Sequence, residues 1–120
     1  MSCPFCDYDQ AYITSSLVIA RYDAFPVTEG HTLVTTKRHV SSYFECAGEE
    51  KAELWLMVDR VKLSLEERFG VKDFNVGINV GATAGQTVMH VHIHVIPRRS
   101  GDMEDPRGGV RGVIPGRQKY

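Results

Sequence analysis

The chain has 120 residues, a formal net charge of −1 and 42% hydrophobic residues. This length fits a single domain, residues 1–120, with enough apolar residues for a core. The nearly balanced charge argues against general binding of nucleic acids or membrane surfaces, and no apolar run is long enough to span a bilayer. The N-terminus does not place an apolar segment after a basic one, so we predict no signal peptide and expect a cytoplasmic protein.

Two segments in the first third of the chain have the character of strands. Residues 16–22 and 31–37 are rich in β-branched residues, which favours extended structure. Pro26 and Gly30 punctuate a predicted loop between them. Residues 41–44 then predict one turn of helix.

The pattern changes to that of an amphipathic helix at residues 48–69. Apolar residues recur there at intervals of three and four: Leu54, Val58, Val61, Leu65 and Phe69. Charged residues fill the other face, and Gly70 stands where a glycine commonly ends a helix. The pattern therefore predicts one long helix.

The second half of the chain predicts two further strands, at 74–80 and 87–96, joined by a flexible turn at 81–86. One long helix and several strands joined by short loops are typical of an antiparallel sheet, so the predicted fold class is α+β. Residues 101–120 are rich in Gly and Arg, and we expect an irregular segment there, outside a core formed by residues 1–100.

Three histidines, His90, His92 and His94, alternate with apolar residues in the last predicted strand. Successive side chains of a strand point to opposite faces, so the histidines share one face at intervals of about 6.6 to 6.8 Å. The other face is filled by Val91, Ile93 and Val95. Imidazole titrates near neutral pH, binds metals and attacks phosphorus as a neutral nucleophile. The pattern therefore indicates a reactive strand face.

The histidine segment from Gly85 to Arg98 reads GQTVMHVHIHVIPR. It resembles the signature of the histidine triad (HIT) superfamily, whose elements follow the same order. Residues 84–88, with Gly101-Asp102 after the histidines, look most like the branch of dinucleoside polyphosphate hydrolases (Fhit-like) and less like the nucleoside phosphoramidases (Hint-like). The resemblance implies a HIT-like fold, with an antiparallel sheet of about five strands packed with one long and one short helix, and a homodimer.

The resemblance also implies a reaction at the α-phosphate of a nucleotide. His92 would attack the phosphorus and form a covalent nucleotidyl-histidine, which water then hydrolyses to a nucleoside monophosphate. The other ring nitrogen of His92 then needs an acceptor for its hydrogen, such as a backbone carbonyl. His94 would bind the phosphate or the leaving group, as an imidazolium that stabilises developing negative charge. Gln86 completes the predicted catalytic group.

Further residues are assigned to nucleotide binding by the same resemblance. Asp23 would accept hydrogen bonds from the ribose hydroxyls, and Asn79 would reach the ribose or a phosphate. Gly85, Gln86 and Thr87 would contact the phosphates, beside His92 and His94. An apolar pocket for the base is expected from Phe5, Val18, Ile19 or their neighbours.

Supporting roles are expected for His31, on the neighbouring strand, and for His90. Two alternatives to these assignments stay open. His31 could be an ordinary hydrogen-bonded structural histidine, and Asp23 could be a solvated turn residue before Phe25-Pro26.

Cys3 and Cys6 have the Cys-x-x-Cys spacing of half a zinc site. His39 and His90 are the candidates for the other two ligands, and a subset of bacterial HIT proteins resembles this pattern. The site would be closed, tetrahedral and therefore structural. A redox pair and two unrelated thiols are the alternatives. A catalytic metal on the three triad histidines is less favoured, because three residues in a row on one strand converge poorly on one ion.

The leading interpretation is a hydrolase of dinucleoside polyphosphates or related adenylates, with a small nucleotide as its partner and no nucleic acid or membrane. Phosphoramidate hydrolysis, phosphorolysis and nucleotide sensing without turnover are the alternatives. Arg107 and Arg111 in the C-terminal segment could hold a polyphosphate, or the segment could be a loose tail.

Overall fold

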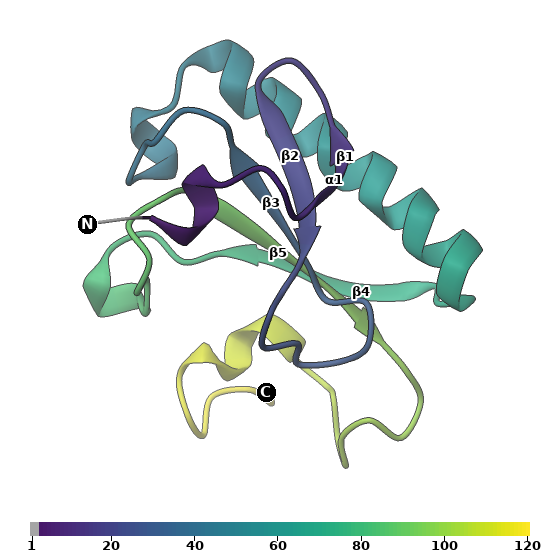
Figure 1. Ribbon diagram of the computed structural model, residues 1–120. Coiled ribbons are helices and arrows are strands. Elements are labelled where there is room, and N and C mark those ends of the chain that lie inside the picture. Colours follow the sequence, from purple (N-terminus) through teal and green to yellow (C-terminus); the bar gives the residue numbers. More distant parts are fainter. Residues whose placement is uncertain (1–2) are drawn as a thin grey trace.

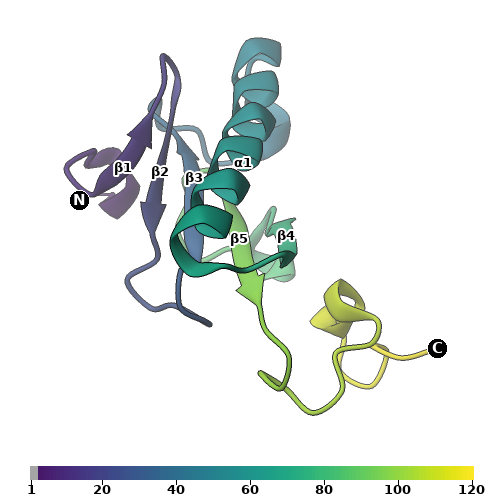
Figure 2. The same cartoon turned by 90° about the vertical axis from the view of Figure 1, so that its right-hand side faces the viewer.

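The computed structural model describes residues 3–120. Five antiparallel strands form one sheet in the order β1-β2-β3-β5-β4. Helix α1 packs along one face of this sheet, and the C-terminal segment extends beyond β4 and β5 (Figures 1 and 2). The strands are β1 (Ala11–Thr14), β2 (Val18–Tyr22), β3 (Thr32–Thr36), β4 (Asp73–Ile78) and β5 (His92–Arg98). This arrangement confirms the predicted α+β class and the five-stranded HIT-like sheet.

The long helix α1 spans Gly48–Phe69, as the periodicity predicts. Gly70 ends it in the left-handed conformation, with φ 69°, and its backbone N–H donates to the carbonyl of Glu66. At the other end, the carboxylate of Glu50 accepts the backbone N–H of Ala47 at 2.8 Å. The remaining helices are short 3-10 turns: η1 (Pro4–Cys6), η2 (Tyr43–Glu45), η3 (Ala82–Ala84) and η4 (Gly109–Val113). Within residues 3–120, no helix has both the length and the apolarity to cross a membrane.

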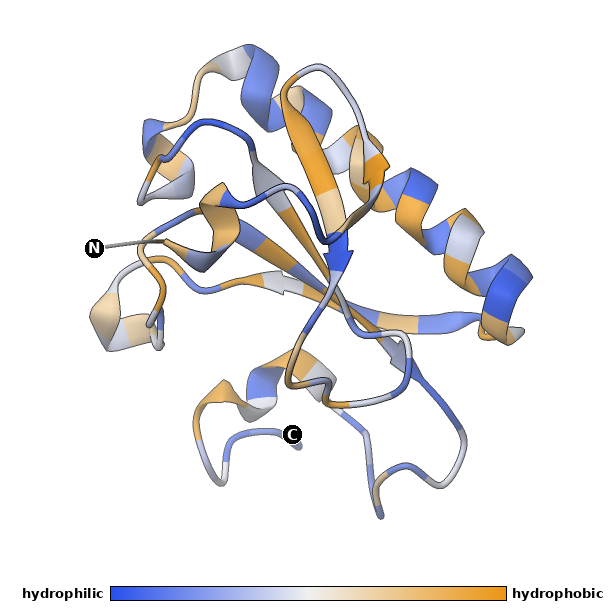
Figure 3. Ribbon diagram, in the orientation of Figure 1, coloured by the Kyte–Doolittle hydropathy of each residue, from blue (hydrophilic) through white to orange (hydrophobic). Residues whose placement is uncertain are grey.

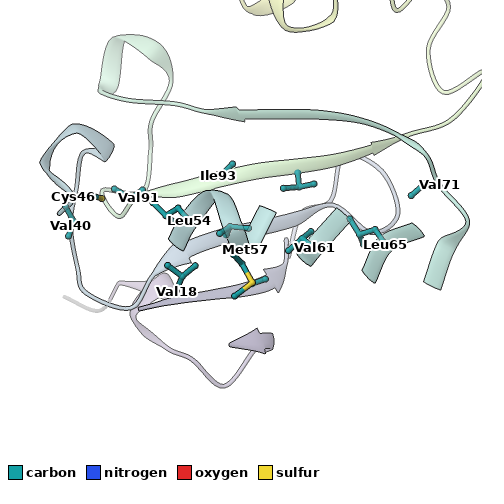
Figure 4. Packing of buried hydrophobic residues seen from close by; sticks show 13 residues of the cluster. Val18, Val40, Cys46, Leu54, Met57, Val61, Leu65, Val71, Val91 and Ile93 are labelled. Atoms are coloured by element: carbon teal, nitrogen blue, oxygen red, sulfur yellow. The ribbon is translucent and has the colours of Figure 1, made fainter. Parts of the chain in front are cut away.

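The core lies between α1 and the sheet. Hydrophobic and hydrophilic residues alternate along the helix, and its hydrophobic side meets apolar strands (Figures 3 and 4). The fully buried members on both layers are Leu54, Met57, Val61 and Leu65 of α1 with Val18, Ala20, Val34, Ile93 and Val95 of the strands. Met57 therefore belongs to the core although it was not part of the predicted stripe, and Val58 of that stripe is partly buried against the same cluster. Adjacent helical positions differ by a rotation of about 100°, and a periodicity argument resolves such a difference poorly.

The strands differ from the prediction most at β1 and at the start of β5. The strand β1 is missing from it, since four residues with a bulge near Ala11 give no clear alternation. The histidine strand begins at His92 and not at residue 87. Residues 79–91 form a loop instead, and its last residue, Val91, donates its N–H to the carbonyl of Val40 at 2.7 Å. His90 therefore precedes the strand.

Candidate active site

The strand β5 presents His92 and His94 on the sheet face opposite the helix. Ile93 and Val95 between and after them are fully buried in the core cluster, so the alternation of the strand directs the two imidazoles the other way. The two ring centroids are 5.1 Å apart. The predicted shared face is thus formed by two of the three histidines, because His90 turns toward a cysteine cluster.

His92 is held in one neutral tautomer by the backbone. Its Nδ1 lies 2.8 Å from the carbonyl oxygen of His90, which can only accept a hydrogen bond. Nδ1 therefore carries the hydrogen, and Nε2 keeps a free lone pair. The ring of Phe5 packs edge-on against His92 with centroids 4.8 Å apart. This carbonyl is the acceptor that the sequence could not identify, and the arrangement makes His92 a competent nucleophile.

His31 fixes the tautomer of His94 in turn. The backbone N–H of Val27 donates to His31 Nδ1 at 3.0 Å, so the hydrogen of the neutral His31 ring is on Nε2. That nitrogen lies 3.0 Å from Nδ1 of His94 and 3.5 Å from a carboxylate oxygen of Asp23. His94 then carries its own hydrogen on Nε2. The contact between His31 Nε2–H and Nδ1 of His94 is compatible with the supporting role expected for His31, because it orients the ring of His94.

Both of these histidines are neutral in the free protein at pH 7. Burial and the neighbouring imidazoles of His92 and His31 lower the pKa of His94 to about 4, against a smaller opposing effect of Asp23. Burial likewise lowers the pKa of His31. In the free protein, His94 is thus a neutral Nε2–H donor, whereas the sequence led us to expect an imidazolium beside the phosphate.

The depressed pKa of His94 predicts a loss of stability in acid. Its folded pKa of about 4 lies below the unfolded value, so the contribution is complete above about pH 6.5 and is lost as the pH falls toward 4. After a discount for partial solvent exposure, we expect about 1–2 kcal/mol of this contribution to be lost by about pH 5. Urea unfolding of wild type and His94→Gln between about pH 8 and pH 5 measures it. The variant should show the smaller pH dependence, and parallel curves would contradict the assignment.

A second expectation concerns the pair of His31 and His94. Replacing His31 by leucine should lower kcat by about 10- to 100-fold, because it removes the Nε2–H donor that orients His94. His31→Gln places an amide N–H near the same point and should retain more activity. Steady-state kinetics of both variants, with AMP affinity as the control for pocket integrity, check this. Equal losses in the two variants would argue for a purely structural histidine.

A cavity of about 710 Å³ opens in front of His92 and His94. The other predicted nucleotide-binding residues that line it are Asp23, Asn79, Gly85 and Thr87. Phe5 forms part of its wall, whereas Val18 and Ile19 are fully buried and do not line it. The expected apolar base pocket therefore draws on Phe5 and not on those strand residues.

Gln86 lies in a different position from the one expected. Its side chain is 4% exposed, accepts the backbone N–H of Gly81 at 2.9 Å, and donates to the carbonyls of Ser41 at 2.8 Å and Val88 at 3.1 Å. Both amide hydrogens are thereby used within the chain, so neither is available to a phosphate. Gln86 holds the loop before β5 in shape.

Arg21 of β2 also lines the cavity, and sequence reasoning missed it. It is 7% exposed and donates from Nη1 to the carbonyl of Pro4 at 3.0 Å and from Nη2 to the carbonyl of Asp7. Its guanidinium lies 5.5 Å from the ring centroid of Phe5. Arg21 thus holds the N-terminal segment against the sheet, and no motif surrounds it that could have revealed this.

The cluster of Cys3, Cys6, His39 and His90 is able to hold a metal ion. Their ligand atoms all lie within 4.8 Å of one another. Nδ1 of His90 is 3.3 Å from Sγ of Cys3 and 3.6 Å from Sγ of Cys6, and Nδ1 of His39 is 3.3 Å from Sγ of Cys6. Tetrahedral zinc bonds would separate sulfur and nitrogen ligands by about 3.5 Å. The four residues therefore fit a zinc ion.

The ring of His90 is oriented in advance for such a site. Its Nε2 lies 2.7 Å from the carbonyl oxygen of Thr36, so that nitrogen donates and Nδ1 faces the thiols with a free lone pair. Within residues 3–120, no group of potential ligands unites all three triad histidines. Asp23, His31 and His94 form the other such group, but the hydrogen bonds described above account for their proximity.

Two known proteins are similar to this chain in amino-acid sequence. The bis(5'-adenosyl)-triphosphatase of Dictyostelium discoideum is 40% identical over 96 residues, which are 80% of this chain and 64% of that protein. The nitrilase and fragile histidine triad fusion protein NitFhit of Caenorhabditis elegans is 42% identical over 80 residues, 67% of this chain and 18% of that protein. The chain thus spans less than two thirds of the length of both curated relatives.

A solved structure is also similar. The zinc-bound histidine triad family protein from Mycobacterium smegmatis is 32% identical, with a TM-score of 0.78 over 87% of this chain and 80% of that one. The family model described as HIT domain matches residues 7–101, the span that contains His31, Asn79 and the histidine strand. The chain therefore belongs to the HIT domain family.

Proposed function

We propose that this protein cleaves dinucleoside polyphosphates or related adenylates at the α-phosphate through a covalent nucleotidyl-His92. The observation that carries the proposal is the hydrogen bond from Nδ1 of His92 to the carbonyl of His90, at 2.8 Å. It leaves the lone pair of Nε2 directed into a cavity of nucleotide size. The relative from Dictyostelium discoideum, a bis(5'-adenosyl)-triphosphatase, supports the same class of substrate.

The proposed reaction has two displacements at one phosphorus. In the first, Nε2 of His92 forms a bond to the α-phosphorus, and the bond from phosphorus to the leaving oxygen breaks with its electron pair. The Nε2–H of His94 donates a hydrogen bond to that oxygen, which stabilises the charge it acquires. In the second, water attacks the phosphorus, His92 departs as a neutral imidazole, a proton is released to solvent, and a nucleoside monophosphate remains.

The cavity residues take the nucleoside and the phosphates in this proposal. Asp23 accepts hydrogen bonds from the ribose, and Asn79 donates to the ribose or a phosphate. Thr87 and the backbone at Gly85 contact the α-phosphate, while Phe5 packs on the base. Gln86 is proposed as a positioning residue for the loop, in place of the phosphate contact expected from sequence.

We further propose that Cys3, Cys6, His39 and His90 hold a structural zinc ion. When bound, the ion would cross-link the segments that carry its ligands. It would have no open coordination position for a substrate or water, since all four ligands come from the protein. It would join the N-terminal segment, which carries Phe5, to the loop whose carbonyl holds His92. The zinc-bound relative from Mycobacterium smegmatis supports this assignment.

A homodimer is proposed as well. The strand β4 is one of the two edge strands of the sheet, and the outer face of α1 leaves Trp55, Leu56 and Leu63 exposed at 42%, 63% and 61%. Both features favour an isologous contact. Light scattering should give twice the chain mass of 13.4 kDa, and a mass of one chain would overturn the proposal.

The test of the proposed function compares steady-state cleavage of diadenosine tri- and tetraphosphate with that of an adenosine phosphoramidate. Preferential cleavage of the polyphosphates is the expected result. Preference for the phosphoramidate would move the protein to the Hint-like activity with the same nucleophile. Retained AMP binding without turnover of any of them would instead favour a nucleotide sensor, and faster turnover with added inorganic phosphate would indicate phosphorolysis.

A further inference from the structure

A second cavity, of about 530 Å³, lies beside the first. Residues of β4, β5 and the 3-10 helix η4 of the C-terminal segment line it. The helix η4, drawn in yellow, contacts β4 (Figures 1 and 2). His94 and Asn79 line both cavities. They form the boundary between the space in front of His92 and this second space.

The walls of the second cavity carry no fixed charge and are largely apolar. Ile96 contributes its side chain from the sheet, and Val110 and Val113 contribute theirs from η4. The amides of Asn75, Asn79 and Gln118 also line it, while Val76 and Ile78 pack their side chains against the core on the other face of the sheet. No Asp, Glu, Lys or Arg of residues 3–120 lines it, and its two histidines, His31 and His94, are neutral at pH 7 for the reasons given above. The strongest hydrogen bonds to phosphate come from cationic groups, and this cavity offers none, so it suits an uncharged group better than a polyphosphate chain.

Gly77 leaves open space at the point where the cavity meets His94. The two residues are direct partners in the antiparallel register of β4 and β5, so they share one sheet face. A Cβ added at Gly77 would meet no atom within 4 Å, and Gly77 is absent from the positive-φ glycines. A side chain at this position would therefore occupy the cavity without straining the strand.

The basic residues of the C-terminal segment are used elsewhere. The guanidinium of Arg107 pairs with Asp105 at 2.8 Å, and that of Arg111 lies 4.6 Å from the ring centroid of Tyr120. Neither residue lines the second cavity. The segment thus contributes valines to this site, where the sequence suggested arginines for a polyphosphate.

We propose that the second cavity is a subsite for the leaving group, and that it accepts an uncharged, largely apolar ring carried by that group. The inference rests on the proposed function, because an in-line displacement sends the leaving group away from His92, and His94 is the next side chain on that face of β5. The ring could be the distal base of a dinucleoside polyphosphate or the aromatic part of an amine.

The test measures binding and not turnover, so that it is independent of catalysis. Calorimetry would give Kd for three ligands: AMP, a methylene-bridged diadenosine triphosphate, and an adenosine 5′-phosphonate with an arylalkyl group. Wild type should bind at least one of the two longer ligands about 10-fold more tightly than AMP, since a buried ring adds apolar contact. The ligand that binds more tightly than AMP shows whether the cavity accepts a distal base or an arylalkyl group.

Gly77→Leu should abolish this gain while changing the Kd for AMP less than about 2-fold. A second, surface pair of variants guards against a folding defect in the strand. Val110 lines the cavity, Ile114 on the same segment does not, and both are 58% exposed. Val110→Asp should raise the Kd of the ligand that binds more tightly than AMP, and Ile114→Asp should leave that Kd unchanged.

Three outcomes would overturn the subsite: no gain in wild type, equal weakening of all ligands by Gly77→Leu, or equal effects of the two Asp variants. Failure of the proposed function would look different. Wild type would then show the binding preference but hydrolyse none of the nucleotides.

Discussion

Replacing His92 by alanine is expected to lower kcat/KM for diadenosine triphosphate by about 10⁴-fold or more, while the affinity for AMP changes only a few-fold. In the proposed reaction the imidazole is the nucleophile, so no covalent route remains without it. AMP affinity should persist because Asp23, Asn79 and Thr87 stay in the wall of the cavity. Single-turnover kinetics and calorimetry on the same preparations measure both quantities.

The matched control for this variant is Thr87→Ala, at an exposed position in the same cavity. It removes a proposed phosphate contact but no reacting atom, so we expect a loss of about 10-fold. A His92→Ala enzyme that retained a tenth of the wild-type rate would exclude His92 as the nucleophile.

Replacing Cys3 and Cys6 by serine is expected to remove one bound zinc per chain and to lower the free energy of unfolding by about 3 kcal/mol or more. The four ligands come from the N-terminal segment, the loop after β3 and the loop before β5, so the ion would join three distant parts of the chain. Turnover should also fall. His90 is a proposed zinc ligand, and its carbonyl accepts the hydrogen bond from Nδ1 of His92. The turn η1 between the cysteines carries Phe5, which packs against His92.

Zinc analysis by mass spectrometry and urea unfolding measure the two effects. Cys46→Ala is the control, because Cys46 is a free thiol outside the cluster and should leave the zinc content unchanged. Wild type purified without zinc, or a double serine variant of unchanged stability, would contradict a structural metal site.

Much of the scaffold follows from patterns that the sequence displays directly. The helix from Gly48 to Phe69 has enough turns for its apolar spacing to be unambiguous, and Gly70 marks its end. The histidine signature identifies the family because its spacing is so specific. The Cys-x-x-Cys pair likewise suggested His39 and His90, which the fold brings to within ligand distance.

The remainder depends on tertiary contacts that leave no local trace. The strand β5 starts only at His92 because the preceding residues form a loop, which Gln86 holds through hydrogen bonds to Gly81 and Ser41. The sequence around Gln86 does not distinguish it from a solvent-exposed glutamine. The neutral state of His94 follows from burial beside two other imidazoles. Arg21 acts on carbonyls of a segment more than ten residues away, which no motif encodes.

The central claim is that His92 becomes covalently attached to a nucleotide during turnover. Rapid acid-free quenching of wild type with diadenosine triphosphate, followed by peptide mass spectrometry, tests it most directly. We expect one nucleoside monophosphate on the peptide that contains His92, and none in the His92→Ala variant. Turnover at full rate with no adduct, or an adduct on His94, would contradict the account.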